Sequence, residues 1–259
     1  MLRTRVIPIL LLRGGGLVKG ARFRKHRYVG DPINAVRIFN EKEVDELILL
    51  DISATAEGRG PNVALISEIA SECFMPLCYG GGLRTVEEMR AVLSAGVEKV
   101  AVNTAAVEVP GLIRRAVDRF GSQSVVVAID ARRRLFGGYE ARVRAGSRGT
   151  GRTPVEAACT AAAEGAGELL LTAVDREGTR TGYDLELIRS VSDSVNVPVI
   201  AAGGAAGLDD FAQAIGEGHA SAVAAGSLFV FQGRHQAVLI SYPETDILER
   251  VLHDLGGAG

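Results

Sequence analysis

The chain has 259 residues, of which 47% are hydrophobic and 23% are charged. This composition is typical of a globular protein with a large core, and the length suits one α/β barrel or two smaller domains. The formal net charge of −2 and the absence of Trp give no reason to expect a broad basic surface for nucleic acid or an anionic membrane.

Three cysteines, Cys73, Cys78 and Cys159, show neither metal-ligand spacing nor a disulfide framework, so buried free thiols are expected. The apolar run from Val6 to Leu12 is too short for a signal-peptide core with a cleavage site, and too short to span a bilayer. A cytoplasmic enzyme without a metal site or cofactor is therefore expected.

Short apolar runs alternate with amphipathic stretches, which predicts parallel strands buried on both faces, each followed by a helix. The strands are expected at Arg5–Leu12, Glu46–Asp51, Met75–Tyr79, Lys99–Asn103, Ser124–Ile129, Glu168–Ala173, Val197–Ala201 and Ser221–Ala225. The helices are expected at Pro32–Glu43, Val63–Glu72, Val86–Ala95, Pro110–Phe120, Pro154–Gly165, Leu185–Ser194, Leu208–Glu217 and Glu244–Leu255.

Eight such units close naturally into a single (β/α)8 barrel, with a doubly wound open sheet as the alternative. Two connections are long, and long loops on the C-terminal face of a barrel carry lids and substrate contacts. Ala131 to Thr153 is expected to form a β-hairpin with Gly137-Gly138 at its turn. Arg13 to Asp31 carries side chains that could reach an anionic ligand: Lys19, Arg22, Arg24, Lys25, His26 and Arg27.

One pattern occurs twice. The stretch Pro76–Gly82 returns 122 positions later as Pro198–Gly204, and each copy is an apolar strand running into glycines before a helix. Glycines there let backbone N–H groups approach an anion, and the helix N-terminus adds a positive end. The repeat predicts two half-barrels, about 1–120 and 121–259, each with a phosphate cradle. Tight turns without a ligand are the alternative.

Catalytic residues of such barrels lie at the C-terminal ends of the strands. Asp130 is the clearest candidate because it directly follows the apolar run Val125–Ile129, and desolvation there would raise its pKa toward that of a general acid or base. Carboxylates that only cap loops are the alternative. The polar residues expected at this face are Asp51, Asn103, Thr104, Asp130, Asp175, Glu177 and Ser227.

The opposite face of the barrel is also polar. Arg5, Glu46, Lys99 and Glu168 begin the first, second, fourth and sixth strands, so all four are expected on the N-terminal face. Two cations and two anions could form a closed ring of salt bridges across the barrel floor, which suggests a gate or a docking surface. Isolated surface charges are the alternative.

With these residues assembled, the chain resembles the cyclase subunit of imidazole glycerol phosphate synthase, the HisF family, over nearly its whole length. The resemblance implies two phosphate sites and a glutaminase partner on the barrel floor, from which ammonia crosses the barrel to a bisphosphorylated ribulosyl aminoimidazole carboxamide. The matching stretches are GDP (Gly30–Pro32), DELILLDISA (Asp45–Ala54), YGGGL, KVAVNTAAVE (Lys99–Glu108), FGSQSVVVAIDA (Phe120–Ala131), GAGELLLTAVDREGTRTGYD (Gly165–Asp184) and AAGG.

The resemblance also implies residue roles. Asp130 would be the general acid, Lys19 would lie on a loop closing over substrate, and Asp51 would be a retained site carboxylate. The floor ring would be the ammonia gate. The phosphate and substrate contacts would come from Gly81, Gly82, Asn103 and Thr104 on one side, and from Asp175, Gly178, Gly203, Gly204, Gly226 and Ser227 on the other.

One departure from the family pattern changes the expected function. The family's general base is an aspartate at the end of the first strand, in a stretch similar to CLDVKDG, whereas this chain has ILLLRGG with Leu11 at that position. Glu177 also stands where an aspartate is usual. Leucine cannot accept a proton, and loss of a general base typically removes about 10²–10⁴-fold in rate.

The chain is similar in this stretch to a paralogous group that works in surface-polysaccharide biosynthesis, beside a glutaminase paralogue and an enzyme that installs an acetamidino group on a sugar. The leading hypothesis is therefore a subunit that delivers ammonia for sugar amidination. The second is a working cyclase of histidine biosynthesis in which Asp51 or Glu177 serves as the base. A phosphosugar-binding scaffold without chemistry is the third, and the related isomerase of the same pathway is the fourth.

Overall fold

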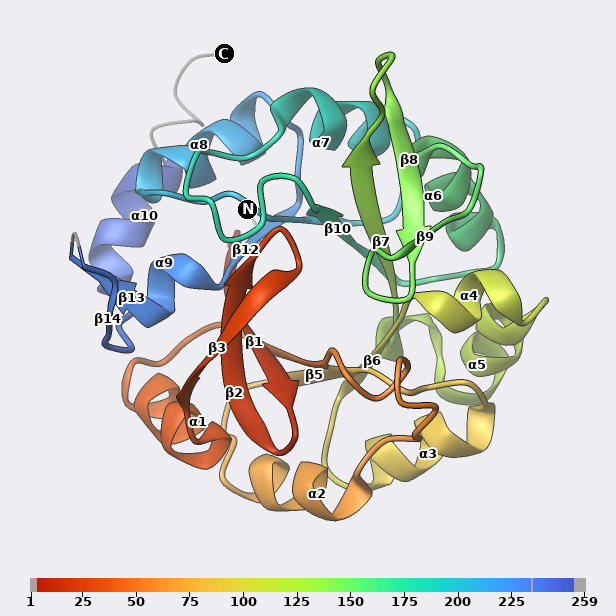
Figure 1. The fold of residues 1–259 in the computed structure, drawn as a ribbon, viewed down its shortest axis with the longest axis horizontal. Helices are drawn as coiled ribbons and strands as arrows, with labels where there is room; N and C mark the ends of the chain where they lie inside the picture. Colours follow the sequence, from red (N-terminus) through yellow and green to blue (C-terminus); the bar gives the residue numbers. More distant parts are fainter. Residues whose placement is uncertain (1–3, 234, 254–259) are drawn as a thin grey trace.

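Eight parallel strands close into a ring inside a layer of helices (Figure 1). The computed structural model describes residues 4–233 and 235–253. Because β12 pairs with β1 and β10 pairs with β7, the sheet has no free edge within the ring, which confirms the predicted barrel and excludes the open sheet. The ring runs through β1 (Arg5–Arg13), β4 (Leu47–Asp51), β5 (Leu77–Gly80), β6 (Lys99–Val102), β7 (Val125–Arg133), β10 (Glu168–Ala173), β11 (Val199–Ala202) and β12 (Ala222–Ala225).

The helices begin at local sequence signals. Thr85 and Thr153 each form a capping box with the glutamate three residues later, and Pro154 pre-sets the first turn of its helix. The predicted end of the last helix, Leu255, lies outside the described residues. The main helices are α1 (Pro32–Glu41), α2 (Val63–Ser71), α3 (Val86–Ser94), α5 (Leu112–Phe120), α6 (Pro154–Ala163), α7 (Leu185–Ser192), α8 (Leu208–Gly216) and α10 (Thr245–His253).

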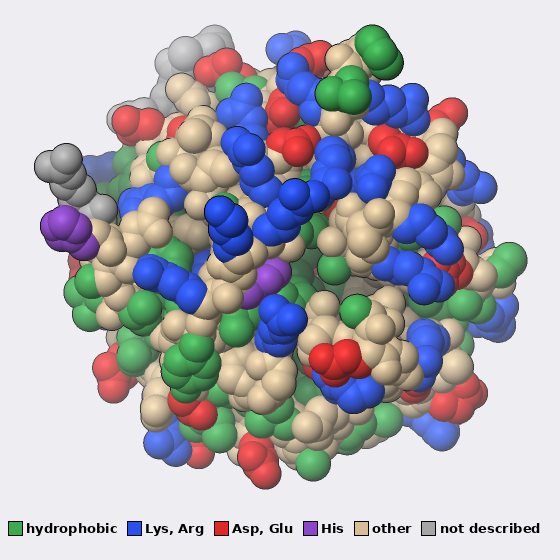
Figure 2. Space-filling view, viewed as in Figure 1, with side chains coloured by type: hydrophobic (Ala, Val, Ile, Leu, Met, Phe, Trp, Pro, Cys, Tyr) green, Lys and Arg blue, Asp and Glu red, His purple; other side chains and the backbone are tan. Residues whose placement is uncertain are grey.

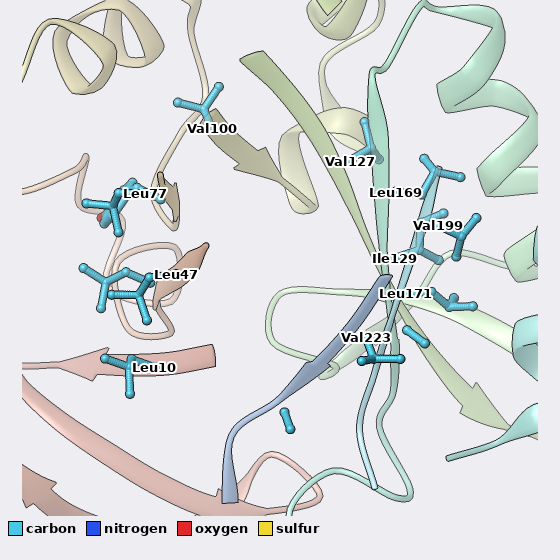
Figure 3. Packing of buried hydrophobic residues seen from close by; sticks show 14 of the residues in the cluster. Leu10, Leu47, Leu77, Val100, Val127, Ile129, Leu169, Leu171, Val199 and Val223 are labelled. Carbon is cyan, nitrogen blue, oxygen red and sulfur yellow. The ribbon is translucent and has the colours of Figure 1, made fainter. Parts of the chain in front are cut away.

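Alternate residues of the barrel strands enter two separate apolar clusters. Leu10 packs outward against the helices while Leu11 faces the barrel interior, and Leu169 and Leu170 divide in the same way. Figure 3 shows outward-facing members of several strands. This alternation explains why the strands read as continuous apolar runs: both of their faces are buried.

Both long connections form antiparallel hairpins. The predicted hairpin after the fifth barrel strand is confirmed, since β7 continues to Arg133 and pairs with β8 (Tyr139–Val143). The connection after the first strand was expected only as a long basic loop, but it folds as β2 (Gly16–Ala21) and β3 (Arg24–Gly30) against β1. The remaining elements are α4 (Thr104–Glu108), η1 (Ser122–Ser124), β9 (Arg148–Gly149), α9 (Ser227–Val230), β13 (Phe231–Gln232) and β14 (Ala237–Val238).

The repeated glycines make equivalent contacts in the two halves. Gly81 and Gly203, 122 residues apart, have φ of +122° and +92°, and a Cβ at either would overlap a carbonyl oxygen at the end of the preceding barrel strand. Gly82 and Gly204 also have positive φ and lie against backbone of the preceding loop. Only glycine tolerates both the conformation and the approach, so these residues are required for packing whatever they bind.

The cysteines differ from the expectation. Cys78 is buried in the barrel, but Cys73 is half-buried and Cys159 is exposed, so the prediction of three buried thiols was wrong. Cys159 lies on α6, where its sulfur is 3.6 Å from the carbonyl oxygen of Ser194. In the described part of the chain, no helix is both long and apolar enough to cross a membrane.

Candidate functional site

The C-terminal mouth of the barrel is covered by the β2–β3 hairpin. Lys19 of β2 is 2% exposed, and its Nζ donates to Glu177 Oε1 at 2.8 Å, which ties the hairpin to the loop between β10 and α7. The backbone N–H of Arg22 donates to the Glu177 carbonyl at 2.8 Å. Gly178 has a φ of +71° and no Cβ to clash with the Gly20 carbonyl, so the hairpin can lie directly on this loop.

Lys19 also reaches the turn after the last barrel strand. A Cβ at Gly226 would overlap Lys19 Nζ, so the ammonium lies directly against the backbone of this turn. The hydroxyl of Ser227 is buried next to this turn and has no hydrogen-bond partner among the residues that the structure describes. The ammonium, the hydroxyl and the backbone turn are groups of the kind that contact anions, although the ammonium is paired with Glu177 in this structure. The structure therefore brings Lys19, Glu177, Gly178, Gly226 and Ser227 together.

Asp130 lies deep in the same mouth, opposite Arg142 of β8 and beside Thr172 of β10 in the sheet register. Burial raises the pKa of Asp130 to about 7, and the negative charge of Glu177 contributes to the increase. A carboxyl group with this pKa can donate or accept a proton near neutral pH. Burial also lowers the pKa of His26, with Arg13 and Lys19 adding to the effect.

Leu11 is the counterpart of Asp130 in the other half of the barrel. Leu11 pairs with Leu50 of β4, Asp130 pairs with Thr172 of β10, and Leu50 and Thr172 are 122 residues apart. The environments differ in polarity, because Leu11 lies in an apolar cluster that includes Val18 and, half-buried, Leu50 and Ile52. One half of the mouth thus has an acid at this place and the other half has a hydrocarbon surface.

Asp51 holds the turn that follows β4. Its Oδ1 accepts from the backbone N–H of Ser53 and Ala54, at 2.9 and 3.0 Å, and from the Ser53 hydroxyl at 2.8 Å. Its Oδ2 lies 3.5 Å from a guanidinium nitrogen of Arg59. Both carboxylate oxygens of Asp51 therefore have partners within its own loop. This matches the alternative that the carboxylate caps a loop. Arg59 was not foreseen, because the loop before α2 has no periodic pattern.

Asn103 and Thr104 attach the second hairpin to the barrel. Asn103 Nδ2 donates to the carbonyl oxygens of Ala128 and Arg142, at 2.9 and 3.3 Å, and the Thr104 hydroxyl accepts from the backbone N–H of Arg144 at 3.0 Å. The short helix α4 starts at Thr104, and α9 starts at the corresponding place in the other half. The phosphate role expected for Asn103 and Thr104 stays a prediction.

Asp175 joins the two hairpins. Its Oδ2 accepts from the Arg133 backbone N–H at 2.8 Å, and its carbonyl oxygen accepts from Arg22 Nε at 3.1 Å. Arg142 was missed as a neighbour of Asp130, because the prediction of Gly137-Gly138 at the turn did not fix the strand register. The turn comprises residues 134–138, so Gly137 and Gly138 end it, and the resulting register places Arg142 opposite Asp130.

The four charged residues on the barrel floor form a closed ring. Arg5 pairs with Glu46 and Glu168, and Lys99 Nζ lies 3.0 Å from Glu46 and 2.8 Å from Glu168. Burial alone would raise the pKa of Glu168, but hydrogen bonds from Lys99 and Arg5 outweigh it and hold the pKa below its usual range. Glu168 is therefore ionised at neutral pH, with a cation on either side of it. The expected role of the ring as an ammonia gate stays a prediction.

The described residues contain no group of three or more His, Cys, Asp and Glu side chains arranged to hold a metal ion. These residues define the protein as a (β/α)8 barrel with a carboxyl group and a buried ion pair at the mouth and a charged ring at the floor.

Comparison with known proteins gives the family. Residues 5–236 match the model of the histidine biosynthesis protein family. The chain is 53% identical to the Pseudomonas aeruginosa protein named "Putative imidazole glycerol phosphate synthase subunit hisF2", over 96% of this chain and 99% of that one. Corresponding proteins of Leptospira borgpetersenii (48% identity, 94% and 96% covered) and Vibrio vulnificus (hisF3; 46%, 97% and 97%) are also similar. The chain belongs to the HisF family.

Proposed function

We propose that this chain is a HisF-type subunit that receives ammonia from a glutaminase docked on the barrel floor and delivers it for amidination of a sugar in surface-polysaccharide biosynthesis. The observation that carries the proposal is the contrast between the two ends of the barrel. The floor ring is complete, whereas Leu11 replaces the proton acceptor at the mouth and packs into an apolar cluster.

The barrel interior supports this proposal. The side chains that face it between floor and mouth are mostly apolar, including Ile7, Ile48, Val126, Leu170 and Ile200. An apolar passage favours neutral ammonia over the ammonium ion, because an unpaired charge is costly to bury. Ammonia entering past Lys99 would therefore cross as the reactive free base and emerge beside Asp130.

A second candidate is a working cyclase of histidine biosynthesis, in which Glu177 replaces the missing base. The observation in its favour is that Glu177 is close enough to Asp130 to raise its pKa, so the mouth holds two interacting carboxyl groups. Against it, Glu177 Oε1 is paired with Lys19. Asp51, the other replacement considered, has both oxygens engaged.

A cyclase assay on the purified chain decides between the two. Ammonium salt serves as the nitrogen donor with the bisphosphorylated ribulosyl aminoimidazole carboxamide, so no glutaminase is needed. We expect no turnover from the wild-type chain and a gain of activity in Leu11→Asp. Wild-type turnover of about 1 s⁻¹ or more would contradict the proposal and establish the cyclase.

A further inference from the structure

The β7–β8 hairpin ends in an exposed apolar tip. Leu135 and Phe136 are 98% and 102% exposed and lie in the turn between the two strands. In Figure 1 this hairpin extends across the helix layer on the face where the barrel mouth opens. Two large apolar side chains left in solvent are a candidate contact for another molecule, since aromatic and aliphatic anchors dominate interface energetics.

The same face has a concentration of unpaired positive charge. Figure 2 shows Lys and Arg side chains gathered over the β2–β3 hairpin and along the β7–β8 hairpin. Five of them are exposed and have no ion-pair partner among the described residues, and we call them the basic collar. The basic collar consists of Arg13, Arg22, Arg24, Lys25 and Arg134. The net charge of −2 for the whole chain therefore conceals a basic face around the mouth.

We propose that the basic collar and the Leu135–Phe136 tip dock an acidic surface of the enzyme that consumes the ammonia. This inference rests on the proposed function. Ammonia released into water at neutral pH becomes ammonium, which is no longer a nucleophile, so a conducting barrel needs its mouth covered by the acceptor enzyme. The collar supplies charge complementarity and orientation, and the tip supplies the buried anchor.

A protein fits this face better than a membrane does. The apolar tip is a single two-residue feature on one hairpin, and the rest of the chain is net acidic, which opposes adhesion to an anionic bilayer. An acceptor enzyme can cover the mouth and bind the tip at the same time, because a protein surface can hold a pocket for the tip beside the area that covers the mouth. Binding to anionic lipid is treated below as an outcome that would overturn the proposal.

The first experiment uses a photo-crosslinking amino acid at Phe136 in the full chain, expressed in its own host. Phe74 is the matched control, because it is 86% exposed but precedes β5 and so lies at the other end of the barrel. We expect position 136 to crosslink to one acidic protein that position 74 does not capture, even if position 74 captures the glutaminase that is proposed to dock at that end of the barrel. No protein adduct at position 136, or an adduct to lipid, overturns the proposal.

The second experiment measures affinity between the captured protein, purified, and the barrel chain alone. We expect Phe136→Ser to weaken binding at least about tenfold, and Arg24→Glu with Arg134→Glu to weaken it at least tenfold and reduce its salt dependence. The control pair Arg90→Glu with Arg119→Glu makes the same charge change on exposed helix residues and should alter affinity less than about twofold. Equal losses in both pairs would overturn the proposal.

The two proposals fail separately. Cyclase turnover by the wild-type chain would remove the proposed function whatever the crosslinking shows. Absence of turnover together with no adduct at Phe136 would leave the proposed function standing and remove the docking surface. A captured protein that forms an amidinated product in a glutamine-dependent way only with the wild-type tip would support both.

Discussion

Lys19 of β2 and Glu177 of the β10–α7 loop form a buried ion pair, with Nζ 2.8 Å from Oε1. Together with Arg22 Nε, which donates to the Asp175 carbonyl, this pair links the β2–β3 hairpin to the loop that follows β10. In Glu177→Gln the charge attraction is lost while the shape is kept, so we expect the hairpin to open more often. Trypsin should then cleave at the exposed Arg24 and Lys25 several-fold faster than in the wild-type chain.

Glu57→Gln is the matched control for the trypsin measurement, because Glu57 also forms an ion pair, with Arg59, but does so on the surface. Its cleavage rate should equal that of the wild type. Inorganic phosphate should slow cleavage of the wild-type hairpin if the groups at Lys19, Gly226 and Ser227 bind an anion. Unchanged cleavage in Glu177→Gln would show that backbone contacts such as Arg22 to Glu177 hold the hairpin alone.

Asp130 makes stability depend on pH. Because burial raises its pKa to about 7, the folded chain holds this proton more tightly than the unfolded chain. The stabilisation of the folded chain that comes from this proton is complete below the ordinary Asp pKa and is lost as pH rises through about 7. Asp130→Asn should therefore gain stability over wild type between pH 5 and pH 8, by about 1–3 kcal/mol in urea unfolding. Asp118→Asn, at an exposed site, should show no such trend.

Leu11→Asp places a carboxyl group in an apolar cluster. We expect it to cost about 2–4 kcal/mol of unfolding free energy at pH 7.5, and less at pH 5 where the acid can stay neutral. Leu11→Ala, which loses only packing, should cost a similar amount at both pH values. If both variants respond equally to pH, the new carboxylate has found solvent or a cation, and the mouth is wetter than the packing of Leu11 indicates.

The floor ring depends on both of its cations. Lys99→Met leaves Glu46, which is 2% exposed, and Glu168 with only Arg5 between them, so we expect a loss of about 2–4 kcal/mol at pH 7. The pKa of Glu168 is lowered in the fold, so its stabilisation is present above the ordinary Glu pKa and is lost as pH falls. The difference between variant and wild type in urea unfolding should therefore shrink toward pH 4. A constant difference would mean the ring contributes packing alone.

Substitution of Gly204 tests whether the repeated strand-to-helix turn requires glycine. Its φ is +117°, and a Cβ would overlap the Gly182 carbonyl, so Gly204→Ala should destabilise the chain by about 2 kcal/mol or more in urea unfolding. Gly207, three residues on, has an extended backbone and open space around its Cα, so Gly207→Ala should change stability by less than about 0.5 kcal/mol. Equal effects would mean that the backbone at Gly204 can relax.

Strand and helix positions were predictable because each barrel strand is buried on both faces and reads as an apolar run. The ring strands and main helices fall within a few residues of their predicted places. The β2–β3 hairpin was not predictable, because its strand β3 (Arg24–Gly30) is mostly polar and carries no alternating pattern. Its strand character comes from pairing with β2, which in turn pairs with β1.

Site residues were predictable where a polar residue ends an apolar run. Asp130 follows that rule, the floor ring residues were recognisable because each directly precedes an apolar run, and Leu11 was recognisable by the residue that is missing there. The partners of these residues were not predictable. Arg59 next to Asp51, and Arg142 opposite Asp130, come from loops and a hairpin whose register depends on turn geometry.

The sequence by itself determined the barrel, the family and the loss of the strand-one acid, because these depend on local patterns of apolar, glycine and charged residues. Only the tertiary structure decided which charges meet. Lys19 and Glu177 are 158 residues apart in the chain, and Arg5 and Glu168 are 163 apart, so no local pattern relates them. The same holds for the basic face, because folding gathers arginines from separate loops while the net charge of the chain stays near zero.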